Sequence, residues 1–133
     1  MFATDLTELS NKIAPKVKSL AGFSDAKISL ITVLEQAPNY YYPGVAEAES
    51  IASERIQNAI AEFAEKIQVP KERQHIEYGS VKNNVLSYAK GINADLIVVG
   101  SHGRHGLARL LGSSANAIVN GAECDVLLIR ASE

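Results

Sequence analysis

Short apolar runs alternate with amphipathic stretches along this 133-residue chain, and this alternation limits the possible folds more than any other feature. The runs at residues 28–33, 96–99 and 126–129 are rich in β-branched residues and apolar nearly throughout. Such runs are typical of strands that helices cover on both faces. The alternation therefore predicts an α/β fold, an open and mostly parallel five-stranded sheet of Rossmann-like type with helices on both faces.

We expect strands near residues 2–4, 27–34, 74–77, 95–100 and 125–130, with helices at about 6–20, 45–67, 81–91 and 114–120. Ser80 is the expected N-cap of the third helix, and Gly121 is expected to end the fourth in a left-handed conformation. Pro15 should kink the first helix or move its start to about residue 15. So little chain precedes residue 4 that the first strand should be short or truncated.

Composition excludes several classes of protein. The formal net charge is −2, so the chain lacks the basic surplus of a dedicated nucleic-acid or membrane binder. Its single cysteine, Cys124, excludes an internal disulfide framework and a multi-cysteine zinc cage, and is expected in the core. No signal-peptide pattern or membrane-length apolar stretch is present. We expect one soluble, cytoplasmic domain over residues 1–133.

Two segments carry chemistry suited to a ligand site. In open α/β sheets, ligands bind at the carboxyl ends of strands, where the strand order reverses. The first strand leads into an acid and hydroxyls, and the fourth leads into a glycine- and serine-rich segment that opens a helix. Free N–H groups at a helix start attract anions, and a phosphate or polyphosphate suits such a pocket best. The candidate residues are Ala3, Thr4, Asp5, Val99, Gly100, Ser101, His102, Gly103, Arg104, Gly112, Ser113 and Ser114.

Each feature also has a structural interpretation. Ser113 or Ser114, taken singly, is more often a helix N-cap than a ligand donor. Asp5 could cap the first helix with Glu8 completing a capping-box-like pair. Convergence of acid, glycines and hydroxyls at one edge favours the ligand interpretation.

The stretch ADLIVVGSHGRHGLARLLGSSANAIVNGAECDVLLIR, residues 94–130, resembles the C-terminal signature of the universal stress protein family. Residues 3–10, 28–35 and 45–67 extend the resemblance to nearly the whole chain. The resemblance implies strand order 3-2-1-4-5 and ATP or AMP, possibly with Mg²⁺, bound between strands 1 and 4. By analogy, Asp5 would contact ribose, the main chain near Val33 would meet adenine, and glycines 100, 103 and 112 with Ser113 would hold phosphates. It also implies a homodimer, formed through the last strand, Asp125 to Arg130.

The glycine spacing departs from the family's nucleotide-binding pattern, G-x2-G-x9-G-[S/T]. Eight residues, not nine, separate Gly103 from Gly112 unless Ser113 takes the final glycine position and Ser114 the hydroxyl position. A non-nucleotide branch of the family also has serines there, but it lacks the glycines at positions 100, 103 and 106. The glycines favour a stress-response regulator that binds an adenine nucleotide.

Two alternatives remain open at this point. The altered spacing and the apolar last strand favour a nucleotide-free homodimeric interaction protein. An enzyme, a nucleotidyl transferase or at most a weak ATPase, is less favoured. Asp5 is the one obvious carboxylate for a magnesium site, and a single carboxylate provides few ligands for the ion. A zinc site of His102, His105 and Cys124 lacks a fourth ligand, and His75 is expected to be a satisfied or exposed strand residue. Tyr40–Tyr42 are expected in an exposed loop.

Overall fold

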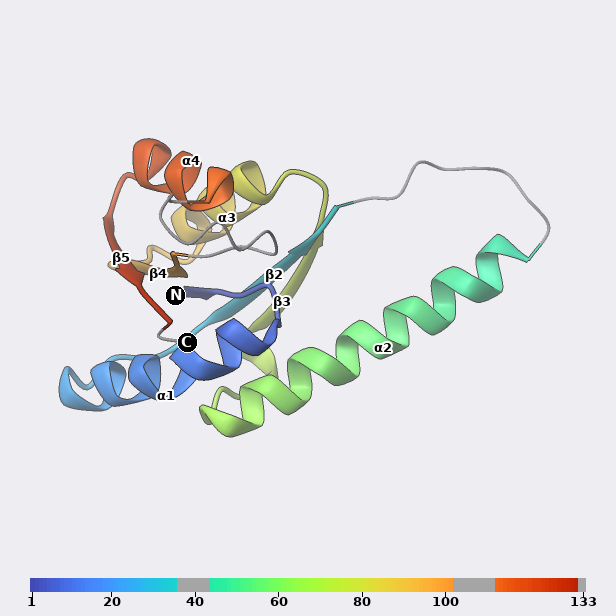
Figure 1. Ribbon diagram of the computed structural model, residues 1–133, viewed down its shortest axis with the longest axis horizontal. Coiled ribbons are helices and arrows are strands. Elements are labelled where there is room, and N and C mark those ends of the chain that lie inside the picture. Colours follow the sequence, from blue (N-terminus) through green and yellow to red (C-terminus); the bar gives the residue numbers. More distant parts are fainter. Residues whose placement is uncertain (36–43, 102–111, 132–133) are drawn as a thin grey trace.

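The computed structural model describes residues 1–35, 44–101 and 112–131, with the backbone alone for residues 45–49. One parallel sheet has the order β3-β2-β1-β4-β5, which confirms the predicted architecture (Figure 1). Its strands are β1 (Phe2–Ala3), β2 (Leu30–Leu34), β3 (Gln74–Tyr78), β4 (Leu96–Gly100) and β5 (Asp125–Ile129). The helices are α1 (Glu8–Phe23), α2 (Val45–Lys66), α3 (Val81–Gly91) and α4 (Ser113–Gly121), with a 3-10 turn, η1 (Lys71–Arg73).

The helices form a layer on each face of the sheet. Helices α1 and α2 cover one face, and α3 and α4 cover the other, with the first turns of α2 reaching beyond the strands (Figure 1). Strand residues alternate between the two layers, so that Phe2 and Leu30 pack with α1 and α2 while Ile31 and Ile97 pack with α3 and α4. All four are fully buried, and their burial supplies the main stabilisation of the fold.

Strand β1 is short, as predicted, and lies at the centre of the sheet. Phe2 is paired with Leu30 on one side and Val98 on the other, and its ring lies 5.7 Å from that of Phe63. Backbone bonds extend the pairing beyond the strand, because the Thr4 N–H donates to the Ile31 carbonyl at 2.9 Å. Strand β2 starts at Leu30, three residues later than predicted, where its register with β1 and β3 begins.

Helix α1 starts at Glu8 with Pro15 inside it, so of the two expected effects of Pro15 the later helix start is wrong. Thr7 is the N-cap, and its hydroxyl accepts from the Ser10 N–H at 3.4 Å. Pro15 is exposed, whereas Ile13 and Val17 on either side of it are buried in the core. Packing of this apolar face keeps the helix continuous despite the backbone hydrogen bond that proline cannot donate.

Of the predicted helix ends, the N-cap of α3 is confirmed and the C-terminal glycine of α4 is not. Ser80 caps α3 as predicted, with its hydroxyl accepting from the Asn83 N–H at 3.2 Å. Gly121 is not a left-handed terminator, because it is the last residue of α4 and lacks a positive φ. A Cβ at Gly121 would lie 2.6 Å from Leu86 Cδ1, so close packing of α4 on α3 explains the glycine.

Strand β5 is an edge strand and is not buried on both faces, contrary to the interpretation of its apolar run. Leu128 is 37% exposed and Asp125 is exposed. Leu127 and Ile129 pack against the α1 and α2 layer, whereas Val126 packs against the opposite layer. A single chain therefore leaves part of the apolar surface of β5 exposed to solvent.

Candidate functional site

Strands β1 and β4 are neighbours at the point where the strand order reverses. Ala3 is paired with Val99, so Thr4 and Asp5 leave β1 at the edge where Gly100 and Ser101 leave β4. The carboxyl ends of parallel strands meet at one edge, which is where open α/β sheets bind ligands. The structure thus brings residues 3–5 of the first predicted segment to the same edge as residues 100, 101 and 112–114, the described part of the second.

The carboxylate of Asp5 is fixed by hydrogen bonds to one of its oxygens. Oδ1 accepts from the Thr7 N–H at 3.0 Å, from the Thr7 hydroxyl at 2.6 Å and from the Ser10 hydroxyl at 2.6 Å. Asp5 is not the N-cap of α1, since that position belongs to Thr7. The capping interpretation of Asp5 is therefore wrong, and the carboxylate remains half-buried at the start of the helix.

The turn between β1 and α1 has an uncommon backbone conformation. Leu6 has φ 58°, in the left-handed region that non-glycine residues rarely adopt. Its N–H donates to the hydroxyl of Thr4 at 3.0 Å, and Thr4 is itself buried. This turn leads the chain from β1 into α1 and leaves Asp5 beside the first turn of the helix.

Gly100 and Ser101 connect β4 to its neighbours at the same edge. A Cβ at Gly100 would lie 3.3 Å from Ile13 Cδ1, so α1 approaches the backbone closely there. The Ser101 N–H donates to the Ile129 carbonyl at 3.1 Å, and the Ser101 carbonyl accepts from the Gly112 N–H at 3.5 Å. That second bond places the start of α4 beside the end of β4.

Helix α4 begins at Gly112 with no side-chain cap. Ser113 and Ser114 lie in its first turn and are exposed, so the expectation that one of them is the N-cap is wrong. The first intrahelical bond runs from the Asn116 N–H to the Gly112 carbonyl at 2.9 Å. The N–H groups of residues 113–115 precede it and have no intrahelical acceptor, which suits them to an anion.

Apolar residues of the candidate set lie beneath this edge. Ala3, Val33 and Val99 belong to the same packing cluster, on the face covered by α3 and α4. Val99 is buried, while Ala3 and Val33 are half-buried. The edge thus combines a half-buried carboxylate and free amide groups with an apolar base.

Several predicted residues fall outside the described ranges, namely His102, Gly103, Arg104, His105, Gly106, Arg109 and Tyr40–Tyr42. Among the residues that are described, no group of three His, Cys, Asp or Glu side chains could hold a metal ion. Cys124 is half-buried against the α3 and α4 layer, as expected of a core residue. Sequence reasoning missed Ser10, whose signal is a hydroxyl five positions after Asp5, on the first turn of the helix.

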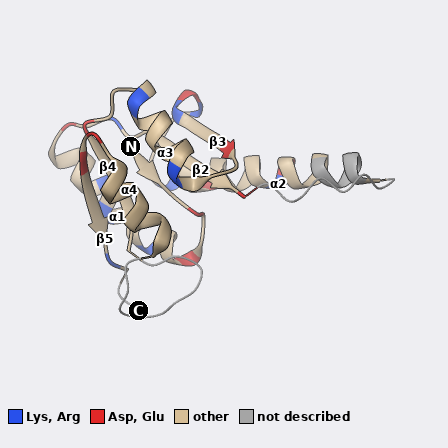
Figure 2. Cartoon of the chain, turned by 90° about the horizontal axis from the view of Figure 1, so that it is seen from above, with Lys and Arg blue, Asp and Glu red and all other residues tan. Residues whose placement is uncertain are grey.

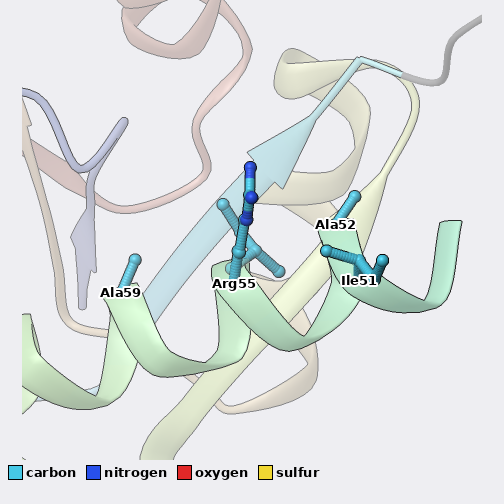
Figure 3. Close-up of a pocket in the computed structure, with 5 residues that line it drawn as sticks. Ile51, Ala52, Arg55 and Ala59 are labelled. Carbon is cyan, nitrogen blue, oxygen red and sulfur yellow. The ribbon is translucent and has the colours of Figure 1, made fainter. Parts of the chain in front are cut away.

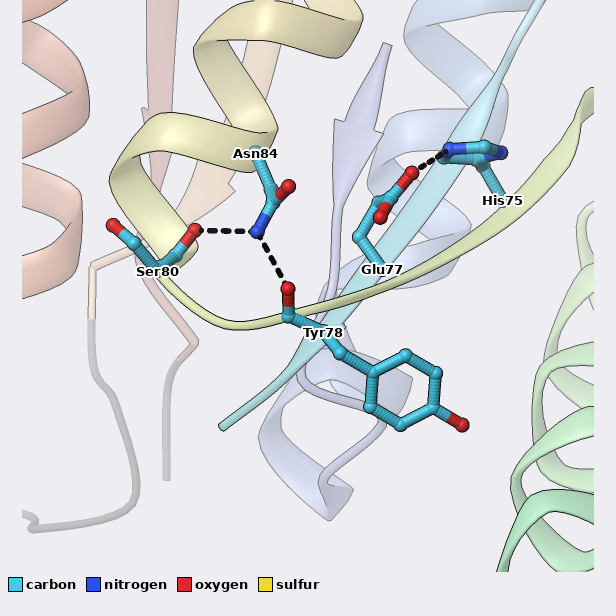
Figure 4. A network of polar contacts seen from close by, with 5 residues as sticks. All are labelled: His75, Glu77, Tyr78, Ser80 and Asn84. Atoms are coloured by element: carbon cyan, nitrogen blue, oxygen red, sulfur yellow. Dashed lines mark hydrogen bonds and ion pairs between the residues drawn. The ribbon is translucent and has the colours of Figure 1, made fainter. Parts of the chain in front are cut away.

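A second polar cluster, the His75 cluster, lies on β3 and α3 and contains His75, Glu77, Tyr78, Ser80 and Asn84 (Figure 4). His75 Nε2 lies 2.7 Å from Glu77 Oε1, which agrees with the expectation of a satisfied strand histidine. Its ring stacks on Tyr88 with 4.4 Å between ring centroids. Burial raises the pKa of the Tyr88 phenol above its ordinary value, and a hydrogen bond with Ser29 partly opposes that rise.

A hollow also runs along α2, and the described residues that line it all belong to that helix (Figure 3). It contains apolar side chains and a single guanidinium, that of Arg55. Its lining includes none of the predicted site residues that the structure describes. Basic and acidic residues are interspersed over the described chain (Figure 2), and no described helix is long and apolar enough to cross a membrane.

Comparison with known proteins gives a consistent result. The sequence model of the universal stress protein family matches residues 1–130. Universal stress protein A homolog 1 of Coxiella burnetii is 38% identical over 134 residues, covering 97% of this chain and 93% of the relative.

Solved structures show the same fold. Hypothetical protein MJ0577 superposes with a TM-score of 0.83 at 19% identity, covering 98% of this chain and 94% of that one. A universal stress protein solved in complex with cAMP superposes with a TM-score of 0.66 at 24% identity, with the same coverages of 98% and 94%.

Proposed function

Because this chain belongs to the universal stress protein family, we propose that it is a stress-response regulator that binds an adenine nucleotide, ATP or AMP. The proposed position is the crevice between β1 and β4. The observation that carries the proposal is that a fixed carboxylate, Asp5, follows β1 and the uncapped start of α4 lies beside the end of β4, the strand paired with β1. The neighbour solved with cAMP supports the ligand class, since cAMP is itself an adenine nucleotide.

The chemistry of the edge fits the two ends of a nucleotide. A carboxylate accepts hydrogen bonds from ribose hydroxyls, and Asp5 supplies a fixed carboxylate at this edge. The main chain near Val33 would meet adenine. The N–H groups at the start of α4 and the hydroxyls of Ser113 and Ser114 would bind phosphate oxygens, together with Gly100, Ser101, His102, Gly103 and Arg104.

Magnesium would enter with the nucleotide. Mg²⁺ is bound in such sites through one or two carboxylates plus substrate phosphates and water. Asp5 supplies one carboxylate at this edge, and one of its oxygens already accepts three hydrogen bonds. Phosphate oxygens and water would therefore supply most ligands of the ion.

Isothermal titration of dialysed protein with ATP and with AMP tests the proposal. We expect saturable binding of at least one nucleotide with a stoichiometry of one per chain. Asp5→Ala should weaken the binding, whereas Asp25→Ala, a change of an exposed acid at the other end of α1, should not. Folded protein that gives no binding heat with either nucleotide at millimolar concentration would contradict the proposal.

A second candidate function is that of a nucleotide-free homodimeric interaction protein. The observation that favours it is the apolar edge strand β5, on which Leu128 is 37% exposed. Leu128 lies on the sheet face that α4 covers. Val119, a residue of α4, is 40% exposed. A second copy pairing along β5 would bury both and remove an open sheet edge. Mass spectrometry of protein purified without added nucleotide separates the candidates, because released AMP or ATP favours the first.

A further inference from the structure

The carboxylate of Asp5 is bonded unequally at its two oxygens. All three hydrogen bonds from Thr7 and Ser10 converge on Oδ1. Within the described part of the chain, no group donates a hydrogen bond to Oδ2. A carboxylate fixed through one oxygen has lost its rotational freedom while the other oxygen stays available as an acceptor.

The Ser10 hydroxyl has an unusual use for a serine inside a helix. Such a hydroxyl commonly bonds back to a carbonyl of the preceding turn. Ser10 instead donates outside the helix to Asp5 at 2.6 Å, and its residue is 7% exposed. The helix does not need this hydroxyl as a cap, because Thr7 already accepts the Ser10 N–H.

The conformation of the preceding turn points in the same direction. Leu6 adopts the left-handed φ of 58°, a conformation that costs energy in a leucine and persists only where its surroundings enforce it. The bonds from Leu6 to Thr4 and from Thr7 to Asp5 enforce it here. Strained backbone and a converging hydroxyl pair thus fix one carboxylate at the edge where β1 and β4 end.

We propose that Ser10 is a positioning residue, which holds Asp5 so that Oδ2 accepts a hydrogen bond from a ribose hydroxyl of the bound nucleotide. The inference rests on the proposed function. Without the Ser10 hydroxyl, the carboxylate regains rotational freedom, and binding must restrict it again. The loss should affect ligands that carry ribose hydroxyls and spare ligands that lack them.

A comparison of two ligands tests this proposal. Titrations with ATP and with 2′,3′-dideoxy-ATP are carried out on the wild type, Ser10→Ala and the control Ser19→Ala, an exposed serine of the same helix. We expect Ser10→Ala to weaken ATP binding by about tenfold, the usual effect of one hydrogen bond to a charged group. Binding of the dideoxy nucleotide should be unchanged, and Ser19→Ala should match the wild type with both ligands.

The other outcomes overturn the proposal in distinguishable ways. If wild type binds neither nucleotide, the proposed function fails and this inference fails with it. If wild type binds and Ser10→Ala binds ATP equally well, the function stands and the positioning role is wrong. Equal weakening of both ligands would show a general structural effect and would also overturn it. Should Ser10→Ala fail to fold, Thr7→Val removes the other hydroxyl donor to Oδ1, and the same comparison applies.

Discussion

At the scale of single residues, two glycines at helix ends differ in what surrounds them. A Cβ at Gly121 would meet Leu86 Cδ1 at 2.6 Å, whereas a Cβ at Gly91 would meet nothing within 4 Å. Alanine is favoured over glycine in helices by up to about 1 kcal/mol. The local packing therefore decides whether replacing the glycine by alanine stabilises the helix.

We predict that Gly91→Ala is neutral or stabilising and that Gly121→Ala is destabilising. The free energies of unfolding of the two variants should differ by about 1–2 kcal/mol, because the new methyl group at residue 121 must displace Leu86. Urea unfolding of both variants beside the wild type measures the difference. Equal stabilities would show that α3 and α4 pack less closely than described.

Burial of the Tyr88 phenol has a consequence for stability at alkaline pH. Its pKa is raised above 10.0 in the folded protein, mainly because burial disfavours the phenolate. Because the folded-state pKa is raised, the phenol of Tyr88 contributes to the free energy of unfolding. That contribution is fully present below the unfolded-state pKa and is lost as pH rises through the folded-state pKa.

We therefore predict that the free energy of unfolding falls from about pH 10 upward and that Tyr88→Phe lessens this fall. Urea unfolding at a series of pH values measures the effect. Tyr78→Phe is the control, because Tyr78 is 49% exposed. A pH dependence that is the same in both variants would contradict the assignment to Tyr88.

At the scale of elements, the start of α3 depends on one hydroxyl. The Asn83 N–H donates to the Ser80 hydroxyl at 3.2 Å, and Asn84 Nδ2 donates to the carbonyls of Tyr78 and Ser80 (Figure 4). We predict that Ser80→Ala lowers the free energy of unfolding by about 1 kcal/mol, the usual effect of losing an N-cap.

Ser87→Ala, at an exposed position within the same helix, is the matched control. It should change the free energy of unfolding by less than about 0.5 kcal/mol. Thermal and urea unfolding of both variants provide the measurement, and an equal effect of the two changes would show that the cap contributes nothing specific.

Sequence patterns predicted the elements well where periodicity is strong. Helix α2 matches its prediction to within one residue, and α3 matches at both ends, because apolar residues recur at helical spacing and Ser80 marks a start. Local signals failed at Pro15 and Gly121, where packing against other elements overrides them. The role of Ser10 escaped prediction because it depends on a turn conformation at Leu6 that no spacing reveals.

At the scale of the whole molecule, the exposed apolar side chain of Leu128 on the edge strand β5 favours association with a second copy of the chain. We predict a homodimer that Leu128→Glu converts to monomer, because an introduced charge at a paired edge would be buried against its own copy. Ile51→Glu, a change of a 54% exposed residue on α2, is the control and should leave the dimer intact. Light scattering after size exclusion measures the mass. A monomeric wild type would contradict the prediction, and a dimer lost only in the Ile51 variant would move the interface to α2.

Amide chemical shifts during an ATP titration of isotope-labelled protein test most directly where the nucleotide binds. We predict that the largest shifts occur at residues 5–7, at Gly100 and Ser101, and at residues 112–115, which lie where β1 and β4 end and α4 begins. Shifts confined to α2 or to the His75 cluster, or no shifts at saturating ATP, would contradict the account.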